Sequence, residues 1–140
     1  RGFSPYTKAG LYDVNNAKIM PELANNNTLL IANVEDELGL ENLDDISKTL
    51  GIDIIFIGLF DLSKSLGIPG DIENKRVIDK LDEAVKIIHQ NGKKVGSIAS
   101  TPEMLKILKD KKLDYITYSV DTGVIKNAYQ LIINEFRELE

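Results

Sequence analysis

The sequence predicts an α/β protein built from about four βα units. Four short, β-branched apolar segments are typical of buried parallel strands, at about 28–34, 53–58, 94–98 and 114–119. A helical pattern follows each of them after a short connection. Such alternation predicts a parallel sheet covered by helices and joined by right-handed crossovers. Four units of this kind make half of an eight-stranded (β/α)8 barrel.

Composition narrows the class of protein. A chain of 140 residues with 43% hydrophobic residues is expected to form a single domain, over 1–140, with a real core. Its 17 basic and 22 acidic residues give a net charge of −5, and no basic cluster favours nucleic acid. The apolar runs are far shorter than the roughly 20 residues that cross a bilayer. Cysteine is absent, which excludes disulfides and thiolate chemistry and suits the reducing cytoplasm, where we expect the protein.

The first units are read from turn residues and apolar spacing. Residues 1–12 have no period and are expected to form a loop. Asp13 or Asn15 is expected to cap a helix that ends near Asn25, before the first strand at 28–34. Apolar residues at near-helical spacing then predict a helix, namely Leu38, Leu40, Leu43, Ile46 and Leu50. Gly51 is expected as its C′ residue.

The later units carry clearer signals. After the second strand, residues 62–73 contain Gly67, Pro69 and Gly70 and are expected to form a loop. A strongly amphipathic helix is predicted over 75–90, ended by Asn91-Gly92. Thr101 and Pro102 open the next helix as its cap and first residue. Asp121-Thr122 opens the last helix, which runs to about Glu138.

Two carboxylates are expected at the carboxyl ends of strands. Glu35 directly follows the first strand, and Asp61 follows the run that ends in Gly58. Barrels and open α/β sheets keep their active sites at that edge, so the pair indicates a divalent-metal site. The backbone N–H groups of Phe60 and Asp61 are candidates for holding an anion such as a carboxylate. Asn33 is a candidate for orienting a substrate oxygen.

Structural alternatives stay open for each of these residues. Glu35 belongs to an acidic stretch that would favour the next helix N-terminus, and Asp61 could cap a helical turn over 62–66. Asn33 could satisfy a backbone group, and Asp121 reads more simply as a cap.

Other catalytic chemistries have weaker support. Ser97, Ser100 and Ser119 have no histidine in their local segments, so a Ser-His-Asp triad is not indicated. The single histidine, His89, is expected near a helix C-terminus, at the wrong end of a βα unit for catalysis. Schiff-base chemistry is also disfavoured, because Lys93 and Lys94 stand at the amino end of their strand, at the opposite face.

Three stretches carry a recognisable pattern, namely Leu30–Glu35 with Leu43–Ile46, Phe56–Gly67 with its Gly-x-x-Asp-Leu-Ser motif, and Tyr118–Thr122. Together they resemble the HpcH/HpaI aldolase family of metal-dependent (class II) pyruvate aldolases. Arg1-Gly2 also looks like the family's Arg-Gly. The resemblance spans most of residues 28–136 and implies the C-terminal half of a TIM barrel.

The resemblance also implies a reaction and roles for named residues. The positions of Glu35 and Asp61 hold a divalent metal, Mg²⁺ or Mn²⁺, and the backbone at Phe60 and Asp61 holds the pyruvate carboxylate. The implied activity is cleavage of a 2-keto-3-deoxy or 4-hydroxy-2-oxo acid to pyruvate and an aldehyde. The family often has Gln at the position of Asn33 and Pro at that of Leu59, which affects the substrate side of the site.

The family's catalytic His and pyruvate-binding Arg come from earlier strands, which would precede Arg1. The catalytic residues are therefore unknown here, and we expect little turnover from this chain alone. Two alternatives remain. One is a non-catalytic half-barrel that self-associates or pairs with a separate N-terminal half, because an open sheet exposes two edges. The other is a related lyase that uses phosphoenolpyruvate or an acyl-CoA.

Overall fold

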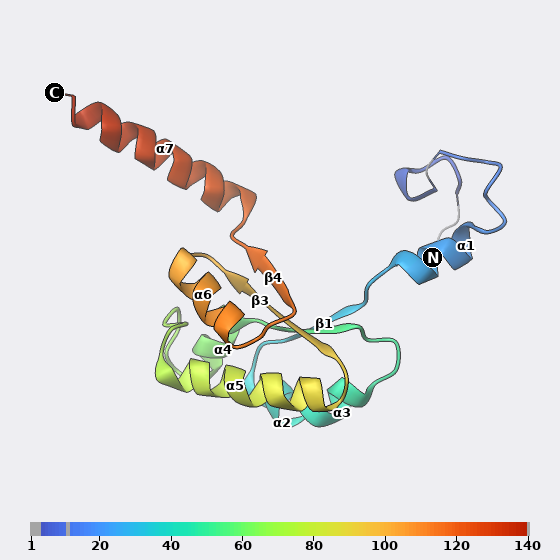
Figure 1. Ribbon diagram of the computed structural model, residues 1–140, viewed down its shortest axis with the longest axis horizontal. Helices are drawn as coiled ribbons and strands as arrows, with labels where there is room; N and C mark the ends of the chain where they lie inside the picture. Colours follow the sequence, from blue (N-terminus) through green and yellow to red (C-terminus); the bar gives the residue numbers. More distant parts are fainter. Residues whose placement is uncertain (1–3, 11, 140) are drawn as a thin grey trace. The chain divides into compact units, whose positions relative to one another are not determined.

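Four parallel strands form the sheet in a computed structural model, which describes residues 4–10 and 12–139 (Figure 1). The strands are β1 (Ile31–Val34), β2 (Ile54–Ile57), β3 (Lys94–Ala99) and β4 (Tyr115–Tyr118). They lie side by side in chain order, β1-β2-β3-β4, and each neighbouring pair is parallel. Because right-handed crossovers between strands added in one direction place every helix on the same face, this order is that of a half-barrel.

Helices alternate with these strands. They are the 3₁₀ helix η1 (Lys8–Gly10), α1 (Met20–Asn27), α2 (Glu37–Glu41), α3 (Leu43–Lys48), α4 (Leu59–Ser65), α5 (Lys75–Gln90), α6 (Pro102–Asp110) and α7 (Asp121–Arg137). The chain divides into two compact units, one up to Leu30 and one from Ile31 onward. A single domain over 1–140 therefore stays a prediction. No helix in the described ranges is both long and apolar enough to cross a membrane.

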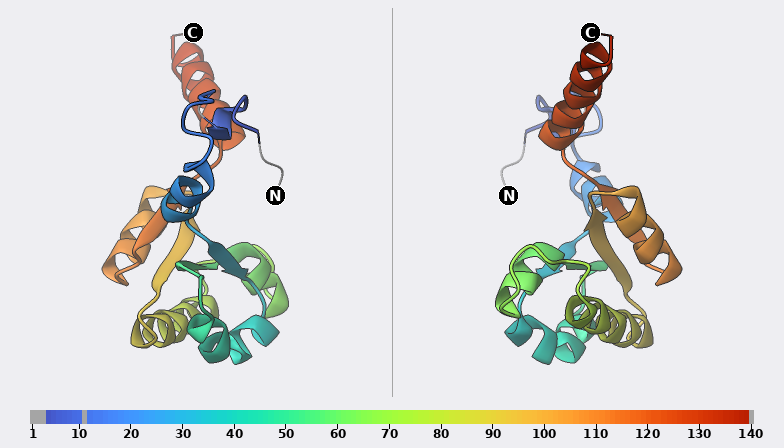
Figure 2. Two further views of the ribbon diagram at one scale, coloured as in Figure 1. Left: turned by 90° about the vertical axis from the view of Figure 1, so that its right-hand side faces the viewer. Right: turned by 90° about the vertical axis from the view of Figure 1, so that its left-hand side faces the viewer.

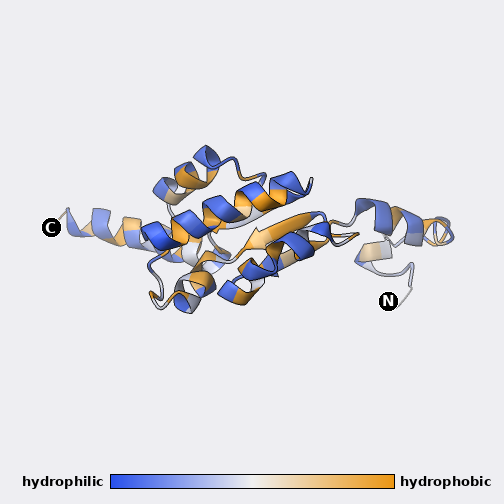
Figure 3. Cartoon of the chain, turned by 90° about the horizontal axis from the view of Figure 1, so that it is seen from below, coloured by the Kyte–Doolittle hydropathy of each residue, from blue (hydrophilic) through white to orange (hydrophobic). Residues whose placement is uncertain are grey.

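The core of the second unit lies between the sheet and the helices that follow its strands. Helix α5 packs on α3 and β3, while α6 packs on β3 and β4 (Figure 2). Fully buried side chains from both layers meet there, including Ile55, Ile57, Leu81, Ile88, Val95, Met104 and Leu108. The helices carry a hydrophobic and a hydrophilic side, as the sequence pattern indicates (Figure 3).

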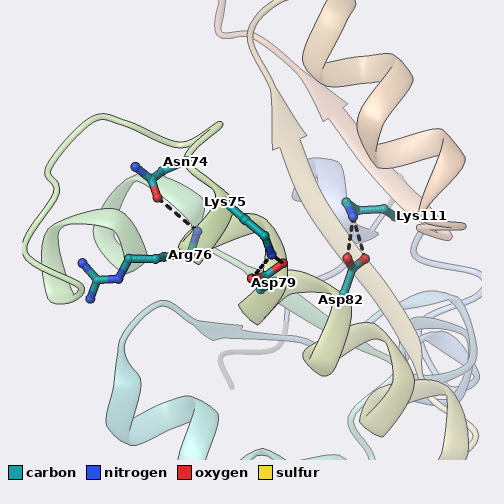
Figure 4. Close-up of polar contacts among 6 residues, drawn as sticks. All are labelled: Asn74, Lys75, Arg76, Asp79, Asp82 and Lys111. Atoms are coloured by element: carbon teal, nitrogen blue, oxygen red, sulfur yellow. Dashed lines mark hydrogen bonds and ion pairs between the residues drawn. The ribbon is translucent and has the colours of Figure 1, made fainter.

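Polar contacts fix the start of α5 and tie it to the end of α6 (Figure 4). The Asn74 side chain accepts a hydrogen bond from the Arg76 backbone N–H at 3.0 Å and caps the helix. Lys75 pairs with Asp79 one turn later, at 2.6 Å. Lys111, just past α6, donates to both carboxylate oxygens of Asp82 at 2.6 and 2.7 Å. Helix α5 therefore has the bounds that its sequence predicts.

The first predicted helix starts later than expected. Helix α1 begins at Met20, next to Pro21, and neither Asp13 nor Asn15 caps it. The Asp13 carboxylate instead accepts hydrogen bonds from the Asn15 backbone N–H at 2.8 Å and the Asn16 amide at 2.5 Å, which closes a turn. The helix also continues two residues past Asn25. Within the loop expected over 1–12, η1 is an added 3₁₀ turn, and residues 1–3 and 11, including Arg1-Gly2, lie outside the described residues.

The first strand and the helix after it also differ from the prediction. Strand β1 starts at Ile31 rather than 28, because its ladder begins opposite Ile54, the first residue of β2. The apolar run after it forms two short helices, α2 and α3, which meet at Asn42. Leu50 lies beyond both and is 93% exposed, so its expected place on the helix face is wrong. Gly51 has a left-handed φ of 84°, two residues after the C-cap Thr49.

Helix α4 replaces the start of the loop expected at 62–73. It begins at Leu59 with Gly58 as the N-cap, so the alternative of Asp61 as a cap is wrong. Three leucines at helical spacing explain the helix, because Leu59, Leu62 and Leu66 are buried in the core.

The last units follow the prediction closely. The Thr101 hydroxyl accepts from the Met104 backbone N–H at 3.1 Å and caps α6, in which Pro102 is the first residue. Helix α7 begins at Asp121, inside the helix rather than at the cap, and its carboxylate accepts from the Thr122 N–H at 2.7 Å. None of the residues of α7 is buried.

Candidate metal site at the carboxyl end of the sheet

The ends of β1 and β2 bring Asn33, Glu35 and Gly58 together. Val34 pairs with Ile57 in the ladder, and the Gly58 N–H donates to the Val34 carbonyl at 2.9 Å. Val34 is buried in the core. Because side chains alternate along a strand, Asn33 and Glu35 project to the opposite side. Both are exposed at the carboxyl edge of the sheet, where the sequence places them.

A hydrogen bond orients the Glu35 carboxylate. The Asn33 amide nitrogen donates to Oε2 of Glu35, so Asn33 acts on the carboxylate of its own strand. The Glu35 side chain lies close to Gly58: a Cβ added to that glycine would be 3.1 Å from the Glu35 Oε2. The Asn33 bond therefore orients the carboxylate, and the glycine at the N-cap of α4 leaves it room.

Phe60 and Asp61 lie on the first turn of α4. The first backbone N–H to donate back into the helix is that of Leu62, to the Gly58 carbonyl at 3.0 Å. Helix geometry points the preceding N–H groups, including those of Phe60 and Asp61, out of the helix end. Both side chains are exposed. An anion at this end would meet backbone donors and a favourable helix dipole.

The remaining residues of the Asp-Leu-Ser motif are structural. Leu62 and Ser63 are both fully buried. The Ser63 hydroxyl donates to the Phe60 carbonyl at 2.6 Å and accepts from the Gly70 N–H at 2.9 Å, and its carbonyl accepts from the Ile68 N–H. Sequence reasoning missed this role of Ser63. The signal for it was a hydroxyl next to Leu62 on the apolar side of a helical turn.

The donor set suits a hard divalent cation with open coordination positions. Among residues 4–10 and 12–139, no group of three His, Asp or Glu side chains forms a ready-made cage. Mg²⁺ is usually held by one or two carboxylates and completes its shell with water and substrate oxygens. Glu35 and Asp61 at one edge of the sheet fit that pattern, and the Asn33 bond holds one of them in place.

The single histidine lies at the opposite edge of the sheet. His89 is in the last turn of α5, and its Nε2 is 2.8 Å from the Asp114 carboxylate. Asp114 also accepts from the Val95 N–H at 3.0 Å and from Lys94 Nζ at 2.9 Å. Burial raises the pKa of Asp114, but these donors outweigh it and lower the pKa to about 2. This cluster fixes the amino ends of β3 and β4, away from Glu35.

The Ser97 and Lys93 side chains are also occupied in structural contacts. The Ser97 hydroxyl is buried and donates to the Ile57 carbonyl at 2.8 Å, which ties β3 to β2. Lys93 donates to the Ile52 carbonyl at 2.7 Å, before β2 begins. Lys93 and Lys94 therefore lie at the amino edge, as the sequence predicts.

Comparison with known proteins places the chain in a family. The HpcH/HpaI aldolase/citrate lyase family profile matches residues 4–128. A 2-keto-3-deoxy-L-rhamnonate aldolase of Klebsiella pneumoniae is 36% identical over 105 residues, which cover 75% of this chain and 39% of that protein. A hydroxypyruvate/pyruvate aldolase of Deinococcus radiodurans is 31% identical over 115 residues, covering 82% and 42%. The chain thus spans about two-fifths of the length of these curated relatives.

Solved structures agree with the half-barrel. An HpcH/HpaI aldolase/citrate lyase family protein from Burkholderia cenocepacia J2315 superposes with a TM-score of 0.85 at 26% identity. The match covers 98% of this chain and 52% of that one. The four βα units therefore correspond to about half of a TIM-barrel-like fold. From the family match over most of its length, the chain belongs to the HpcH/HpaI aldolase/citrate lyase family.

Proposed function

We propose that this chain forms the metal-binding half of an aldolase, a carbon–carbon lyase. The reaction would cleave a 2-keto-3-deoxy or 4-hydroxy-2-oxo acid to pyruvate and an aldehyde. The observation that carries the proposal is the Asn33–Glu35 hydrogen bond beside Gly58, the N-cap of the helix that bears Asp61. The names of the relatives support it, since one is a 2-keto-3-deoxy-L-rhamnonate aldolase and the other a hydroxypyruvate/pyruvate aldolase.

Each residue of the site has a proposed role. Glu35 and Asp61 bind Mg²⁺ or Mn²⁺ through carboxylate oxygens. A cation bound there supplies Lewis-acid polarisation of the substrate carbonyl. The N–H groups of Phe60 and Asp61 hold the substrate carboxylate at the end of α4. Asn33 orients Glu35 and contacts a substrate oxygen.

Acid–base chemistry is proposed to come from outside this sequence. The chain spans about two-fifths of the length of its curated relatives. The carboxyl edge of the sheet, as far as the structure describes it, offers carboxylates and an amide, whereas His89 lies at the amino edge beside Asp114. We therefore expect metal binding without appreciable turnover from the 140-residue chain. Aldol cleavage by the purified chain that is abolished by Asp61→Asn would contradict this expectation.

We also propose that further protein covers the exposed apolar surface of the second unit, either a second copy or an N-terminal half-barrel. Helix α7 exposes a broad apolar side, formed by Val124, Ile125, Tyr129, Leu131, Ile132, Ile133 and Phe136. Water contact with apolar surface costs about 25 cal/mol per Å² relative to burial. On the sheet, the rings of Phe56 and Tyr115 pack edge to face, with 6.4 Å between their centroids, and Tyr115 remains partly exposed. The cytoplasmic location expected from the sequence stays a prediction.

Calorimetric titration with Mn²⁺ tests the metal site. The metal-stripped chain should bind Mn²⁺, and the affinity should rise when pyruvate is present. Asp61→Asn and Glu35→Gln should each abolish binding, because each removes one anionic ligand. Asp79→Asn is the matched control, since Asp79 is an exposed carboxylate on α5. Failure of the unchanged chain to bind Mn²⁺, or equal binding by Asp61→Asn and Asp79→Asn, would refute the proposed site.

A further inference from the structure

We propose that Gly58 is a positioning residue for Glu35, because the missing side chain leaves the space in which the carboxylate lies. This inference rests on the proposed function, in which Glu35 is a metal ligand. It assigns a steric role to a residue that the sequence marks as the end of a strand and the first position of the Gly-x-x-Asp-Leu-Ser motif.

Backbone conformation does not account for glycine at this position. Gly58 has φ −82° and ψ 91°, which lie in the extended region open to any residue. Gly51, Gly67, Gly70 and Gly92 differ, since their φ values are positive and an added Cβ would meet nothing within 4 Å. Those four glycines serve turns, and Gly58 must serve something else.

Contacts with Glu35 account for it. A Cβ added to Gly58 would lie 2.8 Å from the Glu35 Cβ and 3.1 Å from its Oε2. It would also lie 3.6 Å from Oδ1 of Asn33, an ordinary contact distance. Since real Cβ atoms do not approach other atoms closer than 3.0 Å, the Glu35 contact forces a movement. A side-chain rotation cannot relieve it, because the nearest atom is the Cβ of Glu35 itself.

The backbones on both sides resist that movement. Val34 and Ile57 pair in the ladder, and the Gly58 N–H bonds to the Val34 carbonyl at 2.9 Å. Both side chains are buried in the core. Displacing β1 from β2 would therefore disturb packed side chains as well as a hydrogen bond.

Either way of relieving the contact alters the proposed ligand pair. If Glu35 moves, its carboxylate leaves the position in which Asn33 donates to it. If Gly58 moves, the start of α4 moves with it, and Asp61 lies three residues further on. Changes that disturb the orientation of metal ligands typically reduce metal affinity about 10- to 100-fold. We expect a loss of that size for Gly58→Ala.

Two measurements on the 140-residue chain test the inference. The first is Mn²⁺ titration of the unchanged chain and of Gly58→Ala. The second is the urea midpoint of unfolding without metal, for Gly58→Ala in three backgrounds: unchanged, Glu35→Ala and Glu35→Gly. Adding Gly58→Ala should lower the midpoint relative to the same background in the first two, both of which keep a Cβ at position 35. The midpoint should fall much less in Glu35→Gly, which has neither of the two close atoms.

The outcomes separate this inference from the proposed function. Equal Mn²⁺ affinity of the unchanged chain and a folded Gly58→Ala would overturn the positioning role and leave the metal site standing. Equal loss of the urea midpoint in all three backgrounds would overturn the steric explanation. If the unchanged chain binds no Mn²⁺ while the midpoint loss depends on the Glu35 Cβ, the proposed function fails and the packing of Glu35 against Gly58 stands.

Discussion

Replacing Asp114 with asparagine should destabilise the fold in a pH-dependent way. The carboxylate just before β4 accepts hydrogen bonds from the Val95 N–H and Lys94, and it lies 2.8 Å from the His89 ring nitrogen. Burial opposes its ionisation, but these partners lower its pKa from 3.8 to about 2. The ionised form is thus favoured by folding.

The size of the effect follows from this pKa. A shift of nearly two units corresponds to about 2.4 kcal/mol at 1.36 kcal/mol per unit. The side chain is 23% exposed and the residue as a whole is exposed, so screening by solvent reduces this contribution to about 1–2 kcal/mol. Because the pKa is lower in the folded than in the unfolded chain, this stabilisation is complete above about pH 5. It is lost as the pH falls from about 4 toward 2.

Urea unfolding at pH 7, 5 and 3 measures this contribution. The difference in unfolding free energy between the unchanged chain and Asp114→Asn should be about 1–2 kcal/mol at pH 7 and 5 and should narrow at pH 3. Asp79→Asn is the control, because its exposed pair with Lys75 is worth roughly 0.5 kcal/mol or less. A difference that does not change with pH, or one no larger than that of Asp79→Asn, would refute the reasoning.

Two further predictions concern the buried motif serine and the last helix. Ser63→Ala should lower the free energy of unfolding by about 1–2 kcal/mol, since the buried hydroxyl makes part-buried hydrogen bonds to the Gly70 N–H and the Phe60 carbonyl, which would lose their partner. Urea unfolding measures this, with Ser100→Ala at an exposed serine as the control. Ile132→Asp should weaken association of the chain, while Asn127→Asp, which adds the same charge on the polar side of α7, should not. Light scattering over a concentration series measures both, and a chain that is strictly monomeric before substitution would contradict the covered-surface proposal.

The fold was predictable from the sequence where the local apolar pattern agrees with the packing seen in the structure. Helix α5 and the strand β3 after it have a strong period and clear end signals, and the structure has them at nearly the expected bounds. The predicted bounds were wrong where contacts with distant residues, rather than local signals, determine where an element begins. Strand β1 begins only where β2 offers a neighbour, and α1 starts at the residue before Pro21 rather than at a polar cap.

The candidate site was predictable in position but not in detail. Parallel strands end at one edge, so Glu35 and Asp61 were expected there from their places in the sequence. The hydrogen bond from Asn33 to Glu35 and the packing of Glu35 on Gly58 depend on the register of β1 against β2. Neither strand segment reveals that register by itself, because it depends on how the apolar faces of β1 and β2 meet in the core.

The Gly-x-x-Asp-Leu-Ser segment combines buried supporting residues with the exposed carboxylate that we propose as a metal ligand. Leu62 and Ser63 are buried and hold α4 and the loop after it, whereas Asp61 is exposed at the first turn and Gly58 leaves room for Glu35. The Asp114 cluster fixes the other edge of the sheet. Stability and metal binding should therefore separate: Asp114→Asn should lower the urea midpoint with unchanged Mn²⁺ affinity, while Asp61→Asn should do the reverse. A change of Mn²⁺ affinity in Asp114→Asn would show that the two edges are coupled through β3.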